Sequence, residues 1–219
     1  MTFSIVARCP RTGQIGVAAA TALQAVGKLA CHALPKVGAV ASQALLNPYL
    51  AYDGLRLMEQ GVPARTALER VLAGDPDANS RQVGIVDRDG NVAAWTGGEN
   101  IEWAGDRQEA NFSTQGNRLA GPQVLERVVE TMLDTEELDL SERLCLALQA
   151  GIEVGGDTKG ERSVNILVYG EEEYPLCDIR IDDHDDPLNE LRRLFKLYQD
   201  EILPNMQKMP RRADIPRPL

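Results

Sequence analysis

Short runs of β-branched, aromatic and small residues alternate along the chain with segments of helical periodicity. The runs that predict strands are bounded by glycine, proline, asparagine or aspartate, which is typical of strand ends and turns. Turn sequences at residues 9–13 and 87–91 join two pairs of these runs, and each pair predicts a β-hairpin. The predicted strands cover residues 2–7, 14–21, 36–45, 81–86, 92–96, 111–116, 163–169 and 176–181.

Apolar residues spaced three and four positions apart predict helices in the intervening segments. Asn47 followed by Pro48 is typical of a helix start, because asparagine caps the first turn and proline is tolerated at its first position. Gly61 and Gly74 follow the ends of the first two helical patterns. The predicted helices cover residues 48–60, 63–73, 121–133, 140–153 and 187–203.

The order of these elements predicts the fold class. Helices come in pairs between antiparallel hairpins, which does not suit a doubly wound parallel sheet with alternating strands and helices. We expect an α+β fold in which two antiparallel sheets pack together and helix pairs cover the outer faces. We expect one domain over residues 1–204, followed by a proline-rich tail over residues 205–219.

Composition and charge narrow the classes of partner. The chain has 219 residues, 43% hydrophobic residues and a formal charge of −10, which permits a full core and disfavours nucleic acid or an anionic membrane as the main partner. No signal peptide or membrane-spanning run is visible in the sequence. The four cysteines lack zinc-ligand spacing and predict reduced thiols. We therefore expect a cytoplasmic protein without a metal or cofactor.

Thr2 is the first candidate for chemistry. A small second residue allows an aminopeptidase to remove Met1, which leaves the Thr2 hydroxyl beside a free α-amine at the start of a strand. An α-amine has a pKa near ~7.7–8 and can serve as the base for that hydroxyl. The alternative is a strand-forming threonine without a catalytic role, with Met1 retained and the amine blocked.

Amide and hydroxyl side chains gather where predicted strands begin and end. Gln43, Gln82, Thr96, Gln115 and Asn117 occupy such positions, several of them beside glycines. Side-chain amides there suit hydrogen bonds to an oxyanion or to a substrate amide. Turns and sheet edges use the same residue types, so a structural role is the alternative.

Two polar loops offer further candidates. The segment 155–163 (GGDTKGERS) matches neither a phosphate-binding loop nor a dinucleotide fingerprint, but Asp157, Lys159 and Arg162 would orient the charged end of a substrate. A solvated connection is the alternative. The segment 182–186 (DDHDD) contains groups that bind hard cations, yet neighbouring strand residues point to opposite faces. We favour a charged strand end that caps the helix beginning at Pro187 over a metal site.

Several short motifs occur in one order along residues 2–195. They are TFSIVAR at 2–8, GAVASQA at 38–44, RQVGIVD at 81–87, TG at 96–97, WAG at 103–105, QGN at 115–117, GGD at 155–157 and DDH at 182–184. Each motif is unspecific by itself. Together they resemble the bacterial and archaeal domain-of-unknown-function 1028 family, which is assigned to the N-terminal-nucleophile (Ntn) hydrolase fold.

The resemblance implies a four-layer αββα sandwich and a hydrolase that cleaves a small amide or peptide. Thr2 matches the nucleophile position on the first strand. In that reading the groups that stabilise the oxyanion or bind substrate are Gln43, Thr96, Gln115, Asn117, Asp157, Lys159 and Arg162. The alternative is an inactive member of the same fold that binds a ligand or assembles into a homo-oligomer with Met1 retained.

Overall fold

Two antiparallel sheets stacked face to face form the centre of the protein, whose structure is a computed structural model describing residues 2–216. Met1 and residues 217–219, which enter the predicted domain and tail boundaries, lie outside the described residues. In spatial order, the larger sheet consists of β10 (Pro175–Ile181), β9 (Ser163–Tyr169), β2 (Ile15–Thr21), β1 (Thr2–Arg8), β8 (Phe112–Gly116) and β7 (Gly105–Glu109). The smaller sheet consists of β3 (Cys31–Leu34), β4 (Gly38–Ala44), β5 (Arg81–Asp87) and β6 (Val92–Thr96).

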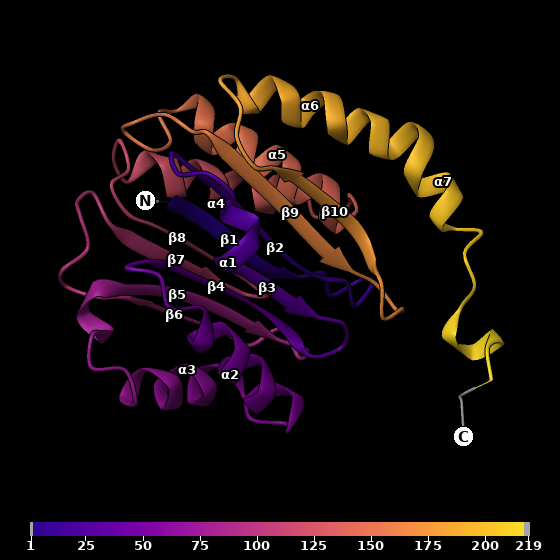
Figure 1. Ribbon diagram of the computed structural model, residues 1–219, viewed down its shortest axis with the longest axis horizontal. Coiled ribbons are helices and arrows are strands. Elements are labelled where there is room, and N and C mark those ends of the chain that lie inside the picture. The colour runs from indigo at the N-terminus through magenta and orange to yellow at the C-terminus, as the bar shows by residue number, and fades with distance from the viewer. Residues whose placement is uncertain (1, 217–219) are drawn as a thin grey trace.

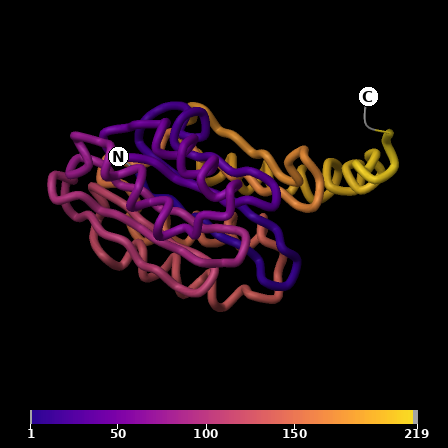
Figure 2. Tube along the Cα trace, turned by 90° about the horizontal axis from the view of Figure 1, so that it is seen from below, coloured from indigo at the N-terminus to yellow at the C-terminus, as the bar shows by residue number. Residues whose placement is uncertain are grey.

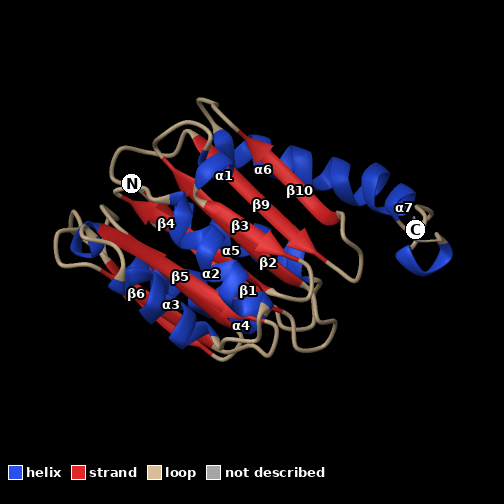
Figure 3. Ribbon diagram, turned by 60° about the horizontal axis from the view of Figure 1, so that its bottom comes forward, coloured by secondary structure: helices blue, strands red, loops and turns tan. Residues whose placement is uncertain are grey.

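Helix pairs cover the two outer faces, as Figures 1 and 3 show. The pair α4 (Gln123–Asp134) and α5 (Leu140–Glu153) packs on the larger sheet, and α2 (Pro48–Glu59) and α3 (Ala64–Ala73) pack on the smaller one. A short helix, α1 (Val26–Leu29), follows β2. Asn47 caps α2, because its side chain accepts a hydrogen bond from the Tyr49 N–H at 3.1 Å.

Strand alternation assigns each residue of β1 to one of two buried layers. Phe3 and Ile5 belong to the core beneath α4 and α5, whereas Val6 belongs to the core between the sheets. Ser4 also faces the second sheet, because its hydroxyl bonds to Gln43 on β4. Both faces of β1 are therefore buried, which explains why its sequence is almost uninterrupted in apolar and small residues.

The C-terminal helical segment packs on the edge strand of the larger sheet. Residues of α6 (Pro187–Leu197) and the following π-helical turn (Tyr198–Ile202) join the same core as β10. The chain continues through α7 (Leu203–Met206) and projects beyond the sheets, as Figure 2 shows. Within residues 2–216, no helix has both the length and the apolar character needed to cross a bilayer.

The α+β class and the two antiparallel sheets are confirmed by the structure. Among the described residues, the sequence patterns missed two strands and two short α-helices, namely β3, β7, α1 and α7. The sequence of β7 is GDRQE, which contains no strand-forming residue, and the segment is extended because it pairs with β8 at the sheet edge. The four-residue lengths of β3 and α1 leave too few positions for a periodic pattern.

Candidate functional site

Thr2 begins β1, the strand that lies between β2 and β8 in the larger sheet. Its side chain is buried in the layer between the two sheets, and its hydroxyl donates to the Thr21 hydroxyl at 3.1 Å. Its carbonyl accepts from the main-chain N–H of Asn117 and from the Gln43 side-chain amide, each at 3.1 Å. Hydrogen bonds from both neighbouring strands and from the second sheet thus fix the position of Thr2.

A pocket of about 120 Å³ opens beside Thr2. Thr2, Thr21, Gln24 and Gln43 supply its polar side chains. The loop after β2, helix α1 and the end of β4 supply the remaining walls, which are mostly aliphatic. None of the described residues that line this pocket carries a charge.

The polar layer around Thr2 contains a buried group of side chains, Ser4, Gln43, Gln82, Gln115 and Asn117, which we call the amide cluster. The Gln43 amide nitrogen lies 2.8 Å from Gln82 Oε1 and 3.3 Å from the Gln115 carbonyl, and Gln43 Oε1 accepts from the Ser4 hydroxyl at 2.7 Å. Gln115 Nε2 donates to Ser4 Oγ at 2.6 Å, and Asn117 Nδ2 donates to Gln82 Oε1 at 2.8 Å. The cluster therefore joins β1, β4, β5 and β8 across the two sheets.

Gln82 extends this network to β6, the edge strand of the smaller sheet, and to β7 and β8 of the larger sheet. Its amide nitrogen contacts Thr96 Oγ1 at 3.0 Å and the carbonyls of Gly105 and Gly116 at 3.1 and 2.8 Å. The Thr96 hydroxyl in turn donates to Asp106 at 2.9 Å. Thr96 thus belongs to the same network as Thr2, although it does not line the pocket.

The structure brings four of the predicted site residues, Gln43, Thr96, Gln115 and Asn117, into one network with Thr2. The Gln43 amide has two hydrogens and already faces three acceptors, so it has no donor left for an oxyanion in this arrangement. Asn117 Oδ1 is the one buried side-chain atom of the amide cluster without a hydrogen-bond partner among the described residues. These amides hold Thr2 and strand β1 in place.

Asp157 forms a buried, bidentate ion pair with Arg118, at 3.0 and 2.9 Å. The same carboxylate accepts from the N–H groups of Ala22 and Lys159, at 3.3 and 3.0 Å. Because Ala22 follows Thr21, this ion pair anchors the end of β2 next to the pocket. Burial raises the pKa of the nearby Glu161, whose carboxylate accepts from the Asp157 N–H at 2.7 Å.

Lys159 and Arg162 do not line the pocket. Lys159 is exposed, and the Arg162 guanidinium pairs with Asp183 at 2.8 Å and with Asp185. Only the main chain of Arg162 approaches the site, where its N–H donates to the Thr21 carbonyl at 2.7 Å.

The acidic segment at residues 182–186 also makes structural contacts. Asp186 caps α6 by accepting from the Asn189 N–H at 3.1 Å, as the sequence predicted. In the part of the chain that the structure describes, no three acidic, histidine or cysteine residues are grouped so as to hold a metal ion.

Sequence reasoning missed Thr21 and Arg118. The signal for Thr21 was present, because the turn at residues 9–14 closes the first hairpin and sets the register that places Thr21 opposite Thr2. Arg118 follows Asn117 with a φ of 53°, outside any regular element. Nothing in a periodic pattern signals its pairing with Asp157.

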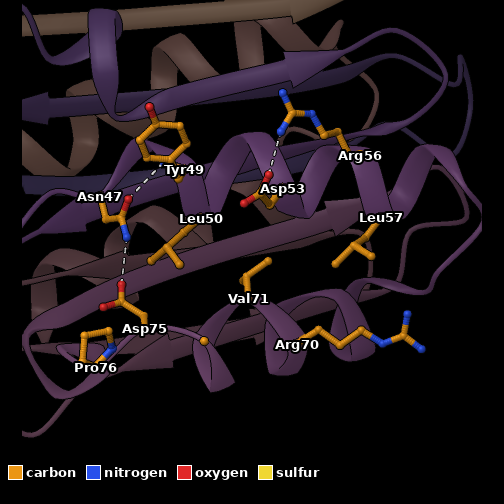
Figure 4. A pocket seen from close by; sticks show the side chains of 11 residues that line it. Asn47, Tyr49, Leu50, Asp53, Arg56, Leu57, Arg70, Val71, Asp75 and Pro76 are labelled. Carbon is orange, nitrogen blue, oxygen red and sulfur yellow. Dashed lines mark hydrogen bonds and ion pairs between the residues drawn. The ribbon is translucent and has the colours of Figure 1, made fainter.

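A larger hollow of about 520 Å³ lies between α2 and α3, on the outer helical layer, as Figure 4 shows. Its polar groups bond mainly to one another: Asn47 donates to Asp75 at 2.9 Å, and Arg56 pairs with Asp53 at 2.7 Å. The guanidinium of Arg81 and the Asn47 amide hold the pKa of Asp75 at about 2. The hollow does not border Thr2 or the amide cluster.

The fold and a comparison with known protein families together assign the protein to a family. The structure is that of an α+β protein with two stacked antiparallel sheets and a buried cluster of polar side chains at one end of the layer between them. The chain belongs to the family of unknown function DUF1028, whose match covers residues 2–191. This agrees with the resemblance seen in the sequence motifs.

Solved structures give a similar result. The crystal structure of protein SPO2555 from Silicibacter pomeroyi, of the DUF1028 family, is 31% identical, covers 100% of this chain and 95% of that chain, and superimposes with a TM-score of 0.90. Anbu (ancestral beta-subunit) from Yersinia bercovieri is 11% identical, with a TM-score of 0.43 and coverage of 95% of this chain and 98% of that chain. That second likeness is too low to support a conclusion. No curated protein sequence matches the chain.

Proposed function

We propose that the protein is an N-terminal-nucleophile hydrolase that cleaves a small amide or peptide with Thr2. The observation that carries the proposal is the position of the Thr2 hydroxyl, on the first residue of a central strand and at the wall of a pocket. The motif resemblance and the two helix-covered sheets support an Ntn-hydrolase-like αββα sandwich. We assign the activity to residues 1–204, with residues 205–219 as a tail.

In this mechanism Met1 is removed and the Thr2 α-amine is free. Thr2 Oγ1 attacks the substrate carbonyl carbon, while the α-amine takes the hydroxyl proton directly or through one water. Collapse of the tetrahedral intermediate breaks the C–N bond, and the amine returns the proton to the leaving nitrogen. Water then hydrolyses the acyl ester and restores the hydroxyl.

Neighbouring groups support the nucleophile in defined ways. Thr21 lies 3.1 Å from the Thr2 hydroxyl and orients it. Gln43 and Asn117 hold the Thr2 carbonyl and so set the direction of the strand end. Their role is positioning, because neither has to touch the substrate to exert it. Tight positioning of this kind reduces the entropy lost on reaching the transition state.

A β-lactone tests the proposal directly. A nucleophilic hydroxyl opens the lactone ring, so that Oγ1 bonds to the carbonyl carbon, the ring C–O bond breaks and the proton moves to the released oxygen. Intact-mass measurement of the treated protein reports the adduct and the presence or absence of Met1 together, and peptide mapping locates the adduct. We expect one adduct, on Thr2, in protein that has lost Met1.

The matched variants are Thr2→Val, which keeps the side-chain shape, and Thr2→Ser, which keeps a hydroxyl. Thr2→Val should lose the adduct and lower turnover of any amide substrate on the order of 10³-fold or more, whereas Thr2→Ser should retain both in part. The proposal is wrong if Thr2→Val reacts like the wild type. It is also wrong if protein that fully retains Met1 is active, in which case a ligand-binding or oligomeric role without Thr2 chemistry is the better reading.

A further inference from the structure

The pocket beside Thr2 is uncharged in its described lining, although the chain carries a formal charge of −10. Lys28 on α1 is exposed and does not line the pocket, and two other charged groups near it are already paired. Asp157 is bound by Arg118, and Arg162 is bound by Asp183 and Asp185. A charged substrate side chain entering this pocket would lose water and meet no oppositely charged side chain, which is strongly unfavourable. The free Thr2 α-amine of the proposed mechanism supplies no charge either, because it takes the hydroxyl proton only in its neutral form.

Three leucines, Leu23, Leu29 and Leu46, line the pocket and also reach solvent, and we call them the apolar collar. Their exposed fractions are 58%, 41% and 38%. They come from the loop after β2, from α1 and from the loop between β4 and α2, three segments that are separate in sequence. Exposed aliphatic side chains that converge on one small opening are typical of a surface that a ligand covers.

The combination of a polar wall and an aliphatic rim favours a small ligand over a protein surface. The hydroxyls of Thr2 and Thr21 and the amides of Gln24 and Gln43 supply the polar groups of the pocket, and aliphatic groups form much of the rest. A few convergent polar groups within an apolar cavity are the usual composition of a small-molecule site. The volume of about 120 Å³ admits a single side chain or a short acyl group, and not a folded element.

We propose that the apolar collar binds the acyl portion of the substrate and that this portion is neutral and apolar. The inference rests on the proposed function and deepens it by naming a substrate class: amides or peptides with an aliphatic side chain next to the scissile carbonyl. The aliphatic group would occupy the collar, and the carbonyl carbon would face the Thr2 hydroxyl. Charged side chains at the same position are excluded.

Binding to the Thr2→Val protein tests this inference without depending on turnover. The probes are the N-acetyl amides of leucine, asparagine and aspartate, which have similar branching but are apolar, polar and anionic. Titration calorimetry should give the tightest binding for the leucine compound, by about tenfold or more over the aspartate compound. Equal affinity for the three compounds would overturn the inference.

Adjacent leucines provide matched variants of the collar. Leu46→Asp places a charge at the pocket, whereas Leu45→Asp places the same charge one residue away, on a side chain that is 55% exposed and does not line the pocket. Leu46→Asp should weaken leucine-amide binding by about tenfold, and Leu45→Asp should change it less than about twofold. Equal effects of the two variants would contradict a specific role of the collar.

Analytical ultracentrifugation of the same variants distinguishes substrate binding by the collar from a second explanation, contact between copies of the chain. If Leu46→Asp converts an oligomer into a monomer and leaves amide binding unchanged, the collar is an interface between copies of the chain and the inference is wrong. If the leucine compound binds selectively but processed wild-type protein forms no β-lactone adduct, the collar assignment stands and the proposed hydrolysis fails.

Discussion

The layer between the two sheets has two ends of opposite character. At the Thr2 end, the inward-facing residues are hydroxyls and amides, the amide cluster among them. At the other end, the same strands contribute an apolar core of aliphatic and small residues, such as Val6, Val17 and Val86. Strand β1 contains both kinds within one alternation, because Ser4 faces Gln43 and Val6 lies in the apolar core.

The difference separates two ways of holding sheets together. The apolar end depends on volume, and cores of this kind tolerate other aliphatic residues of similar size. The amide end depends on each donor meeting its acceptor, since a buried polar group without a partner costs about 1–3 kcal/mol. The amide end therefore fixes the relative position of the sheets more strictly, and it does so next to the proposed nucleophile.

Gln43→Leu should have the largest effect on stability. It removes the acceptor of the Ser4 hydroxyl's hydrogen bond and the donor to Gln82 and to the Thr2 carbonyl. We expect a loss of about 3 kcal/mol or more in the free energy of unfolding, measured by urea denaturation. Val17→Ala, at the apolar end, should cost about 2 kcal/mol. A smaller effect for Gln43→Leu than for Val17→Ala would reverse the comparison.

Gly84→Ala should have an intermediate effect. A Cβ at Gly84 would clash with Gln115 Oε1, so the amide must shift and its bonds to Ser4 must lengthen. We expect a loss of about 1–3 kcal/mol in thermal or urea unfolding. The control is Gly54→Ala in α2, where the added Cβ finds ordinary contacts and should be stabilising by about 0.5–1 kcal/mol. Similar destabilisation by both substitutions would argue against special packing at Gly84.

We expect the smallest effect on the free energy of unfolding from the ion pair between Arg81 and Asp75. Arg81 precedes Gln82 of the amide cluster on β5. The Arg81 guanidinium, at 2.9 Å, lowers the pKa of Asp75 from 3.8 to about 2. Because the folded-state pKa is the lower one, this pair stabilises the protein above pH 3.8 and the contribution is lost as the pH falls toward 2. Unfolding free energies from about pH 5 to pH 2 should fall more steeply for the wild type than for Asp75→Asn. Parallel curves would show that the pair contributes nothing in this range.

Helices and strands were predictable from sequence wherever the segment is long enough to show its pattern of apolar and polar residues. The strand at Ser163–Tyr169 and the helix at Leu140–Glu153 coincide with their predictions. The edge strand β7 was not predictable, because its polar sequence is extended only by pairing with β8. Tertiary pairing determines such a segment, and local propensity does not.

The candidate site was predictable in its residues but not in their connections. Thr2 follows from its place at the start of a predicted strand, and Thr21 follows from the hairpin register. The contact of Gln43 with Gln82 and Gln115 depends on how two sheets stack, which no local pattern encodes. For the same reason Asp157 was interpreted as a substrate-orienting residue, while in the fold it is paired with Arg118.

The position of Thr2 in the middle of a sheet has a practical consequence for anyone producing the protein. An affinity tag fused ahead of Thr2 turns its amine into an amide and adds chain at a position enclosed by β2, β8 and the second sheet. The C-terminal segment after α7 lies on the opposite side of the molecule from the start of β1, as Figure 1 shows. Purification tags therefore belong at the C-terminal end. A substrate screen on N-terminally tagged protein would find no activity even if it contained the true substrate.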